Sequence, residues 1–194
     1  MKVVILQPSY IPWRGYFHQI ALADIFVFYD DVKFDKNGWR NRNRIKTYAG
    51  GQWLTIPVIT ANLERDQIPI NQIKIDNSQN WAKKHWSALV TAYGKTPFFK
   101  DYKPFLEETF SSQPDFLSAF TIPLTIKISG LLGINNTKFI ISSNLDGIAG
   151  KKTDRLISIL TQLGATEYIS GPAAKEYVEE EKFSEHGIQL KYMT

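Results

Sequence analysis

The chain has 194 residues and a formal net charge of +4, with 43% hydrophobic and 22% charged residues. A chain of this length and composition can bury a substantial core, which excludes collagen, coiled coils and bulk disorder. It contains no cysteine, which excludes disulfide frameworks, iron–sulfur clusters and thiol nucleophiles. The mild basic excess suits an anionic small molecule, a nucleotide or a nucleic acid as partner.

The first part of the chain predicts a strand, a helix and a second strand. The apolar run 3–6 ends before a proline, the run 15–23 has helical spacing, and the run 25–29 ends at an acidic pair. This order is typical of a βαβ unit in a parallel sheet. The first run is too short for a signal peptide, and no stretch reaches the ~18 apolar residues of a membrane span. We therefore expect a soluble, cytoplasmic protein with no membrane partner.

The middle of the chain predicts a β-rich insertion at about 36–76. The runs 39–45, 53–59 and 68–75 alternate in polarity or are β-branched. They predict two or three short strands, partly antiparallel. The segment 79–93 follows with helical spacing.

The rest of the chain predicts two helices and then alternating strands and helices, which is typical of a mostly parallel sheet. In chain order, these are helices at 102–110 and 116–132, a strand at 138–142, a helix at 152–163, a strand at 167–170, a helix at 172–185 and a strand at 188–192. We predict a single α/β domain over 1–194. It has a Rossmann-like, mostly parallel sheet, helices on both faces, and an inserted antiparallel β-rich lobe.

Polar residues follow each predicted strand of the parallel part. Ligands of open α/β sheets bind outside the carboxyl ends of the strands, so this topology groups residues that are distant in sequence. The predicted group comprises Gln7, Tyr10, Trp13 and His18 after the first strand, Asp30 and Asp31 after the second, 142–144 after the third, and Ser170 and Gly171 after the fourth.

The members of this group from the first part of the chain can also be interpreted as purely structural residues. The prolines and aromatics of 8–13 can form a rigid turn. His18 can be a satisfied helical residue rather than a catalyst. Asp30 and Asp31 can bind a metal or a ribose, but acidic pairs are also frequent in turns.

The later members are open to two interpretations as well. Ser170 and Gly171 precede a helix that opens with proline, so their backbone amides can bind an anion, or Ser170 can simply cap the helix. Lys152 and Arg155 open the preceding helix against its macrodipole, which a bound phosphate or carboxylate would explain.

The segment 40–44 alternates arginine and asparagine. As a strand it puts Arg40, Arg42 and Arg44 on one face, and Asn41 and Asn43 on the other. The arginine face can grip phosphates or stack on bases beside a nearby tryptophan. It can equally be a solvated edge strand whose charge prevents aggregation.

Several familiar motifs do not occur. The chain has no G-x-G-x-x-G, no Walker loop, no G-x-S-x-G and no H-E-x-x-H. No cluster has the spacing of metal ligands, and nothing indicates a particular cofactor.

Several sequence blocks resemble one family. They are QPSYIPWRGYFHQIALADIFVFYDDV, WRNRNRIK, WLTIPV, NSQNWAKKHW and KKTDRLISILTQLGATEYISGPAAKEY. On these blocks, which reach from the first strand to about residue 177, the chain resembles the WbqC-like family. Members are bacterial proteins often encoded with enzymes of surface-polysaccharide (O-antigen) biosynthesis. Many carry histidine where Leu6 stands, so any role of that histidine is absent here.

The resemblance implies a cytoplasmic role in making or modifying a nucleotide-activated sugar. It also implies that members continue beyond the position of Thr194. The family blocks correspond here to Gln7, Pro8, Tyr10, Pro12, Trp13, Gly15, His18, Asp30, Asp31, Asn41, Arg42, Asn43, Lys152, Arg155, Ser170 and Gly171.

The first functional hypothesis is an acyl or aminoacyl transferase acting on a nucleotide-activated sugar. In this hypothesis His18 acts as the general base, and Asp30 and Asp31 are further catalytic candidates. Arg42, Lys152 and Arg155 hold phosphates beside the amides of Ser170 and Gly171, and Tyr10 and Trp13 pack against sugar or base. Gln7, Asn41 and Asn43 complete the predicted binding set.

Two other hypotheses stay open. A nucleotidyltransferase-like enzyme would use Mg²⁺ on Asp30 or Asp31, although the first loop lacks the second histidine of such enzymes. A non-catalytic RNA-binding module would use the three arginines of 40–44, and its affinity would fall with salt. We expect an anionic small molecule rather than a nucleic acid as partner, and the sequence is compatible with an oligomer.

Overall fold

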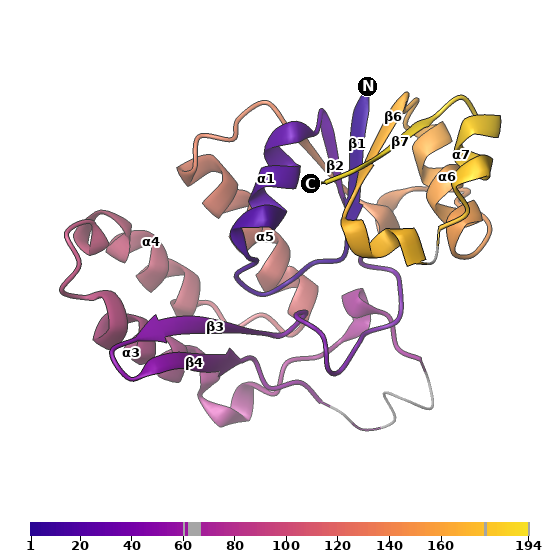
Figure 1. Ribbon diagram of the computed structural model, residues 1–194. Coiled ribbons are helices and arrows are strands. Elements are labelled where there is room, and N and C mark those ends of the chain that lie inside the picture. Colours follow the sequence, from indigo (N-terminus) through magenta and orange to yellow (C-terminus); the bar gives the residue numbers. More distant parts are fainter. Residues whose placement is uncertain (60, 62–66, 177, 194) are drawn as a thin grey trace. The chain divides into compact units, whose positions relative to one another are not determined.

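The computed structural model describes residues 1–59, 61, 67–176 and 178–193. The chain forms two compact units (Figure 1). Unit 1 comprises Met1–Gln7, Trp13–Asp31 and Ile126–Thr194, and unit 2 comprises Pro8–Pro12 and Val32–Thr125. The interpretation of the whole chain as a single domain stays a prediction.

Unit 1 contains a five-stranded sheet whose paired strands are all parallel. Its elements are β1 (Lys2–Leu6), α1 (Arg14–Leu22), β2 (Ile25–Phe28), β5 (Lys138–Ile141), the 3-10 helix η3 (Ser142–Asn144), α6 (Thr153–Gln162), β6 (Glu167–Ser170), the 3-10 helix η4 (Pro172–Glu176), α7 (Glu180–Glu185) and β7 (Gln189–Tyr192). The strands lie in the order β5-β2-β1-β6-β7. Numbered along the chain within this sheet, that is 3-2-1-4-5, the Rossmann order.

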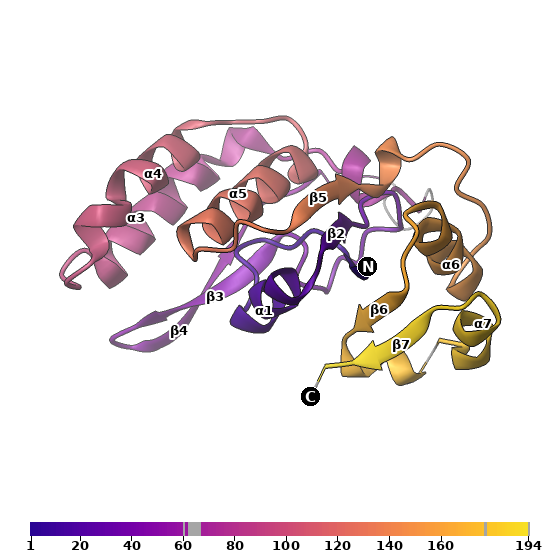
Figure 2. The same ribbon diagram turned by 90° about the horizontal axis from the view of Figure 1, so that it is seen from above.

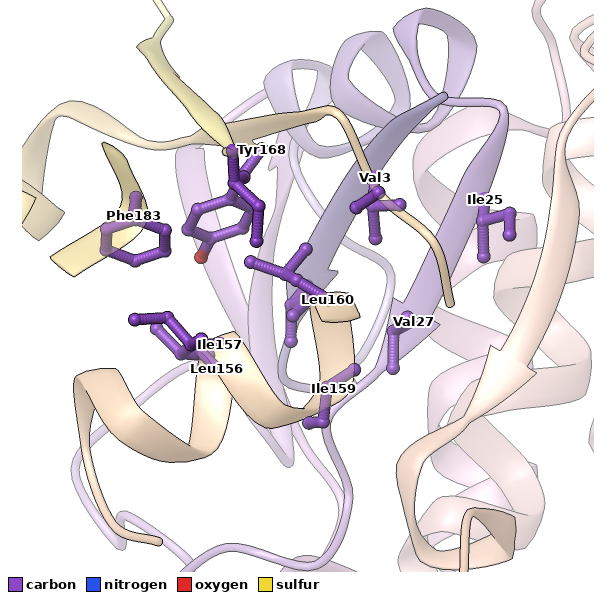
Figure 3. Packing of buried hydrophobic residues seen from close by; sticks show 12 residues of the cluster. Val3, Ile25, Val27, Leu156, Ile157, Ile159, Leu160, Tyr168 and Phe183 are labelled. Carbon is purple, nitrogen blue, oxygen red and sulfur yellow. The ribbon is translucent and has the colours of Figure 1, made fainter. Parts of the chain in front are cut away.

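The two faces of this sheet pack against different side chains. Alternate residues of a strand point to opposite faces. Val3 and Val27 belong to a cluster with Leu160 of α6 (Figure 3). Phe26 lies in ring contact with Tyr16 of α1 and with Phe139 of β5, which puts α1 on the opposite face. Helices on both faces of a parallel sheet confirm the predicted fold class.

Unit 2 contains the inserted β-rich part. Its strands β3 (Arg42–Thr47) and β4 (Gly50–Thr55) form a two-stranded antiparallel hairpin. The 3-10 helices η1 (Ile70–Gln72) and η2 (Asn77–Gln79) precede α3 (Trp81–Tyr93) and α4 (Phe99–Ser111), which pack together (Figure 2). The helix α5 (Leu117–Leu131) begins in unit 2 and ends in unit 1. The predicted antiparallel insertion is thus confirmed.

Of the two or three strands predicted in the insertion, the described residues form two, and the third run is not a strand. The segment 68–75 forms η1 and isolated bridges, among them Lys33 with Pro69 and Val58 with Ile75. Its buried residues explain the difference, because Ile70 and Ile73 are both buried. A spacing of three residues puts both side chains on one side of a 3-10 turn, whereas a strand would point them to opposite faces.

The predicted continuous helix over 172–185 is also wrong, and its residue 177 lies outside the described residues. The segment forms η4 and α7, separated near Glu179. Ala174 and Phe183 are both buried. They are nine positions apart, so one continuous helix with 3.6 residues per turn would turn them to opposite sides.

Candidate functional site

The strand order creates a topological switch point between β1 and β6. From β1 the chain crosses to β2 on one side, and from β6 it crosses to β7 on the other. Ligands of such sheets bind at this point, outside the carboxyl ends of the strands. Gln7 directly follows β1, Ser170 is the last residue of β6, and Gly171 directly follows it. The predicted convergence of these polar residues at one sheet edge follows from the parallel pairing.

Asp30 joins the end of β2 to the end of β5. It is 3% exposed. Its carboxylate accepts hydrogen bonds from the amide of Ser143 at 3.0 Å and from the Ser143 hydroxyl at 2.9 Å. The Ser142 hydroxyl, 3.1 Å from the same carboxylate, accepts a bond from the Asp30 amide at 3.2 Å. Buried carboxylates need such donors, so Asp30 orders the edge of the sheet.

Asp31 pairs with Arg155 of α6. The guanidinium of Arg155 donates to the Asp31 carboxylate, and both side chains are about one-fifth exposed, at 22% and 20%. Arg155 also lies over the ring of Tyr29, 5.9 Å from its centroid. Burial raises the pKa of Tyr29, against the opposing effect of Arg155. The ion pair explains a cation in the first turn of α6 without a bound anion.

The start of α1 carries two predicted site residues. Trp13 occupies the N-cap position but makes no side-chain capping bond, and no acidic residue lies in the first turn. The indole of Trp13 is 52% exposed. It lies over Gly15, where a Cβ would sit 2.5 Å from Nε1 of Trp13. Glycine at this position therefore lets the indole cover the first turn.

His18 lies one turn further along α1 and is exposed. Arg14 is exposed four residues earlier, and side chains at this spacing are neighbours on a helix. The main-chain oxygen of Gln7 accepts a hydrogen bond from the Tyr16 hydroxyl at 3.1 Å. This contact ties α1 to the end of β1.

Lys152 occupies the N-cap of α6 with φ 52° and ψ −126°. Such a conformation is costly for a residue with a Cβ, and strained residues cluster at functional sites. Lys152 is exposed, and Gly150 before it has φ 82°. A Cβ at Gly150 would sit 2.8 Å from that of Asp154, so this turn requires glycine.

Ser170 is buried at the end of β6, and its hydroxyl donates to the hydroxyl of Tyr168 at 3.4 Å. Its carbonyl accepts from the amide of Met193 at 2.9 Å. The Gly171 position is open, with no atom within 4 Å of a Cβ built there. The end of β6 thus combines a buried hydroxyl with open space at Gly171.

Four predicted site residues lie in unit 2 rather than unit 1: Tyr10, Asn41, Arg42 and Asn43. Tyr10 has no exposed surface, and its hydroxyl lies 2.8 Å from Nδ1 of His85. The two rings stack with centroids 5.5 Å apart. This placement favours a structural role for Tyr10.

His85 is itself buried among aromatic rings. It contacts the rings of Trp81 and Phe110. Burial lowers the pKa of His85 from its ordinary 6.5 to about 4, against a backbone hydrogen bond at Thr55 that raises it. The imidazole is therefore neutral at pH 7, as a buried histidine without a carboxylate partner should be.

The two asparagines hold backbone segments together. Asn41 donates to the carbonyl of Ile56 at 2.9 Å. Asn43 donates to the carbonyl of Tyr10 at 3.2 Å and to that of Ile11. Ile11 has φ 42°, so Asn43 stabilises a strained turn.

The arginine face is only partly as predicted. The strand β3 begins at Arg42, and Arg40 instead donates to the Ser9 hydroxyl at 2.8 Å. Arg42 and Arg44 remain on one face and lie over the ring of Trp53, at 5.0 and 5.7 Å. The pairing of Trp53 with Trp39 was missed from the sequence. Two tryptophans flanking a basic segment with a glycine turn were the available signal.

The predicted site residues divide into two groups, one in each unit. At the sheet edge of unit 1 lie Gln7, Asp30, Asp31, Ser170 and Gly171, with Trp13 and His18 on α1 and Lys152 and Arg155 on α6. Among the described residues, no group of three or more His, Asp or Glu side chains could hold a metal ion. No helix within the described ranges is both long and apolar enough to cross a membrane.

Comparison with known proteins places the chain in a family. The family model described as "WbqC-like protein family" matches residues 7–194. The chain is 41% identical over 192 residues to the uncharacterised protein Rv1507c of Mycobacterium tuberculosis, covering 98% of this chain and 81% of that protein. No solved structure matches it significantly.

Proposed function

The chain belongs to the WbqC-like protein family, and on that premise we propose that it is a cytoplasmic transferase of surface-polysaccharide (O-antigen) biosynthesis. It transfers an acyl or aminoacyl group to an amino or hydroxyl group of a nucleotide-activated sugar. The observation that supports this proposal is the switch point between β1 and β6, where Rossmann-like sheets bind nucleotides.

The chemistry proposed here is direct acyl transfer. The acceptor nitrogen or oxygen attacks the carbonyl carbon of an activated acyl donor such as a thioester. The bond from that carbon to the donor's leaving group breaks. His18 takes the proton of the attacking group and returns it to the leaving group. These 194 residues contain no cysteine, so the proposed transfer uses no thiol of theirs.

The binding roles follow the sheet edge. A diphosphate needs positive charge and hydrogen-bond donors. Lys152 supplies positive charge, and the uncapped first turn of α1 supplies amide donors. The exposed indole of Trp13 offers an apolar surface for a sugar or base. Asp31 pairs with Arg155 and fixes its position in the first turn of α6.

The same geometry disfavours the metal-dependent nucleotidyltransferase. A Mg²⁺ ion needs carboxylate oxygens that it can approach. Both oxygens of Asp30 accept hydrogen bonds from Ser143, and Asp31 binds Arg155. These carboxylates already have partners within the protein.

Ligand binding is the first test. We expect a nucleotide-activated amino sugar at about a hundred times its Kd to stabilise the chain by roughly 2.7 kcal/mol, seen as a raised thermal midpoint. Lys152→Ala should reduce this shift, whereas Lys151→Ala, which removes the neighbouring exposed charge, should not. An equal loss in both variants would contradict the role of Lys152.

Turnover is the second test. His18→Gln should abolish acyl transfer and leave the binding of the nucleotide-activated sugar unchanged. His186→Gln, at an exposed histidine of unit 1 next to α7, is the matched control. Full turnover in His18→Gln would refute the general base.

A further inference from the structure

The excess positive charge of the chain lies in one short segment. Residues 36–55 contain five of the 23 Lys and Arg residues and none of the 19 Asp and Glu residues. The rest of the chain, with 18 basic and 19 acidic residues, is close to neutral. From the sequence we expect an anionic small molecule rather than a nucleic acid as partner, but the positive charge is concentrated on the β3–β4 hairpin and the residues before it.

The hairpin has one buried and one exposed face. Ile45 and Leu54 are buried. Directly paired residues of an antiparallel hairpin share a face, and Arg44 pairs with Trp53. Arg42 and Lys46 lie two residues to either side of Arg44 and share its face. The outer face therefore presents three cations in a row beside an indole.

Aromatic surface accompanies this row. Trp39 and Trp53 are each 46% exposed, and their ring centroids lie 5.4 Å apart. Arg42 and Arg44 lie against the ring of Trp53. The four residues Trp39, Arg42, Arg44 and Trp53 are called the indole–arginine patch below.

The guanidinium of Arg44 lies close to Gly51 of β4. A Cβ at Gly51 would collide with it. Glycine at this position leaves room for the guanidinium to lie across β4. Among the described residues, none of Arg42, Arg44 and Lys46 forms an ion pair with a carboxylate. Their charge is therefore available to an external anion.

We propose that the indole–arginine patch, with Lys46, binds single-stranded nucleic acid. Proteins that bind single strands combine a basic track for the phosphates with aromatic rings on which bases stack. The cation row extends along the strand over four residues, about 13 Å at 3.3 Å per residue, which is longer than one diphosphate. Bulky exposed indoles suit unpaired bases, whose faces are open, better than the stacked bases of a duplex. This surface belongs to unit 2, whereas the sheet edge of the proposed transferase belongs to unit 1.

The experiment measures binding of a fluorescent 12-nucleotide oligouridylate to the full chain by anisotropy at several salt concentrations. Three phosphate contacts should give a log–log salt slope near −2, because each contributes about −0.7. Trp53→Ala should weaken binding by about fivefold or more with the slope unchanged, since stacking one base contributes ~1–3 kcal/mol. Arg44→Gln should instead make the slope shallower by about 0.7.

The control removes equal charge elsewhere in unit 2. Lys83→Gln/Lys100→Gln takes two exposed lysines from α3 and α4, and it should leave affinity within about twofold. Arg42→Gln/Arg44→Gln should weaken binding at least tenfold. Equal losses in the two double variants would overturn the proposal.

Two further arms identify the partner. A 12-base-pair RNA duplex should bind at least tenfold more weakly than the single strand. Vesicles containing phosphatidylserine should not compete for the labelled strand. Equal duplex affinity, displacement by vesicles, or no binding of the oligonucleotide at 50 mM salt would each overturn the proposal.

Discussion

At the carboxyl edge of the unit 1 sheet, charged side chains bind one another, whereas on the hairpin of unit 2 the cations lie against indole rings. Asp31 pairs with Arg155 at the first, and Arg42 and Arg44 lie over Trp53 at the second. Paired charges fix the geometry of a site, and unpaired charges attract an external anion. Total charge therefore says little about where a protein binds its anionic ligands.

The buried polar groups of unit 2 also differ from those of unit 1. Its buried polar pair, Tyr10 and His85, is neutral at pH 7, because burial lowers the pKa of His85 and raises that of Tyr10. Unit 1 buries an aspartate and surrounds it with donors. The two units therefore should respond differently to substitution and to pH.

The largest effect is expected at Asp30. Asp30→Ala removes the carboxylate that accepts from the Ser143 amide and hydroxyl, and it deprives the buried Ser142 hydroxyl of one partner. Because hydrogen bonds to a charged group contribute about 1.5–3 kcal/mol each, the expected cost is about 3–5 kcal/mol. Urea denaturation should show this loss. Asp146→Ala removes an exposed aspartate of the same unit and should change stability by less than about 0.5 kcal/mol. A small effect at Asp30 would show that its hydrogen bonds do not order the sheet edge.

The next largest effect is a loss of stability at acidic pH that is caused by His85. Its pKa is about 4 in the folded chain against an ordinary 6.5, so the unfolded chain takes up the proton first as pH falls. This contribution to stability is complete above pH 6.5 and is lost between 6.5 and 4, by about 3 kcal/mol in all.

Urea midpoints at pH 7 and pH 4.5 measure this difference. His85→Gln should be less stable at pH 7 but should lose less on acidification. His186→Gln, at an exposed histidine, should keep the full dependence of the parent chain. Identical pH dependence in His85→Gln and the parent would contradict the assignment.

The smallest effect on folding is expected at the hairpin. Arg44→Gln removes a cation–π contact at an exposed site, which contributes about 0.5 kcal/mol. Its urea midpoint should stay close to that of the parent chain, although its salt-dependent binding of single strands changes. A loss above about 2 kcal/mol would mean that Arg44 belongs to the core of unit 2 rather than to a binding surface.

Local sequence patterns predicted most helices and strands, because hydrophobic spacing acts within short segments. The runs 3–6, 25–29 and 167–170 became β1, β2 and β6 within about a residue. The segments 68–75 and 172–185 form other elements than the strand and the continuous helix predicted for them. Their buried residues, such as Ile70 and Ile73, are spaced to suit neighbouring elements rather than one continuous strand or helix.

The candidate site, too, was only partly predictable from the sequence. That polar residues at strand ends would share one sheet edge was predictable from the alternation of strands and helices. That Asp31 would bind Arg155, 124 positions away, was not, nor was the contact of Tyr10 with His85 across 75 positions. Both are specific side-chain contacts between segments distant in sequence.

The class of fold, the parallel strands and the family could be predicted from the amino-acid sequence, because hydrophobic periodicity, turn residues and motif blocks are properties of short segments. Which charges are paired and which are exposed became known only from the folded chain. It bonded the aspartates of the sheet edge to partners within unit 1 and left the hairpin cations against Trp53. The reason is physical: burial and pairing depend on distances between segments that the chain brings together only on folding.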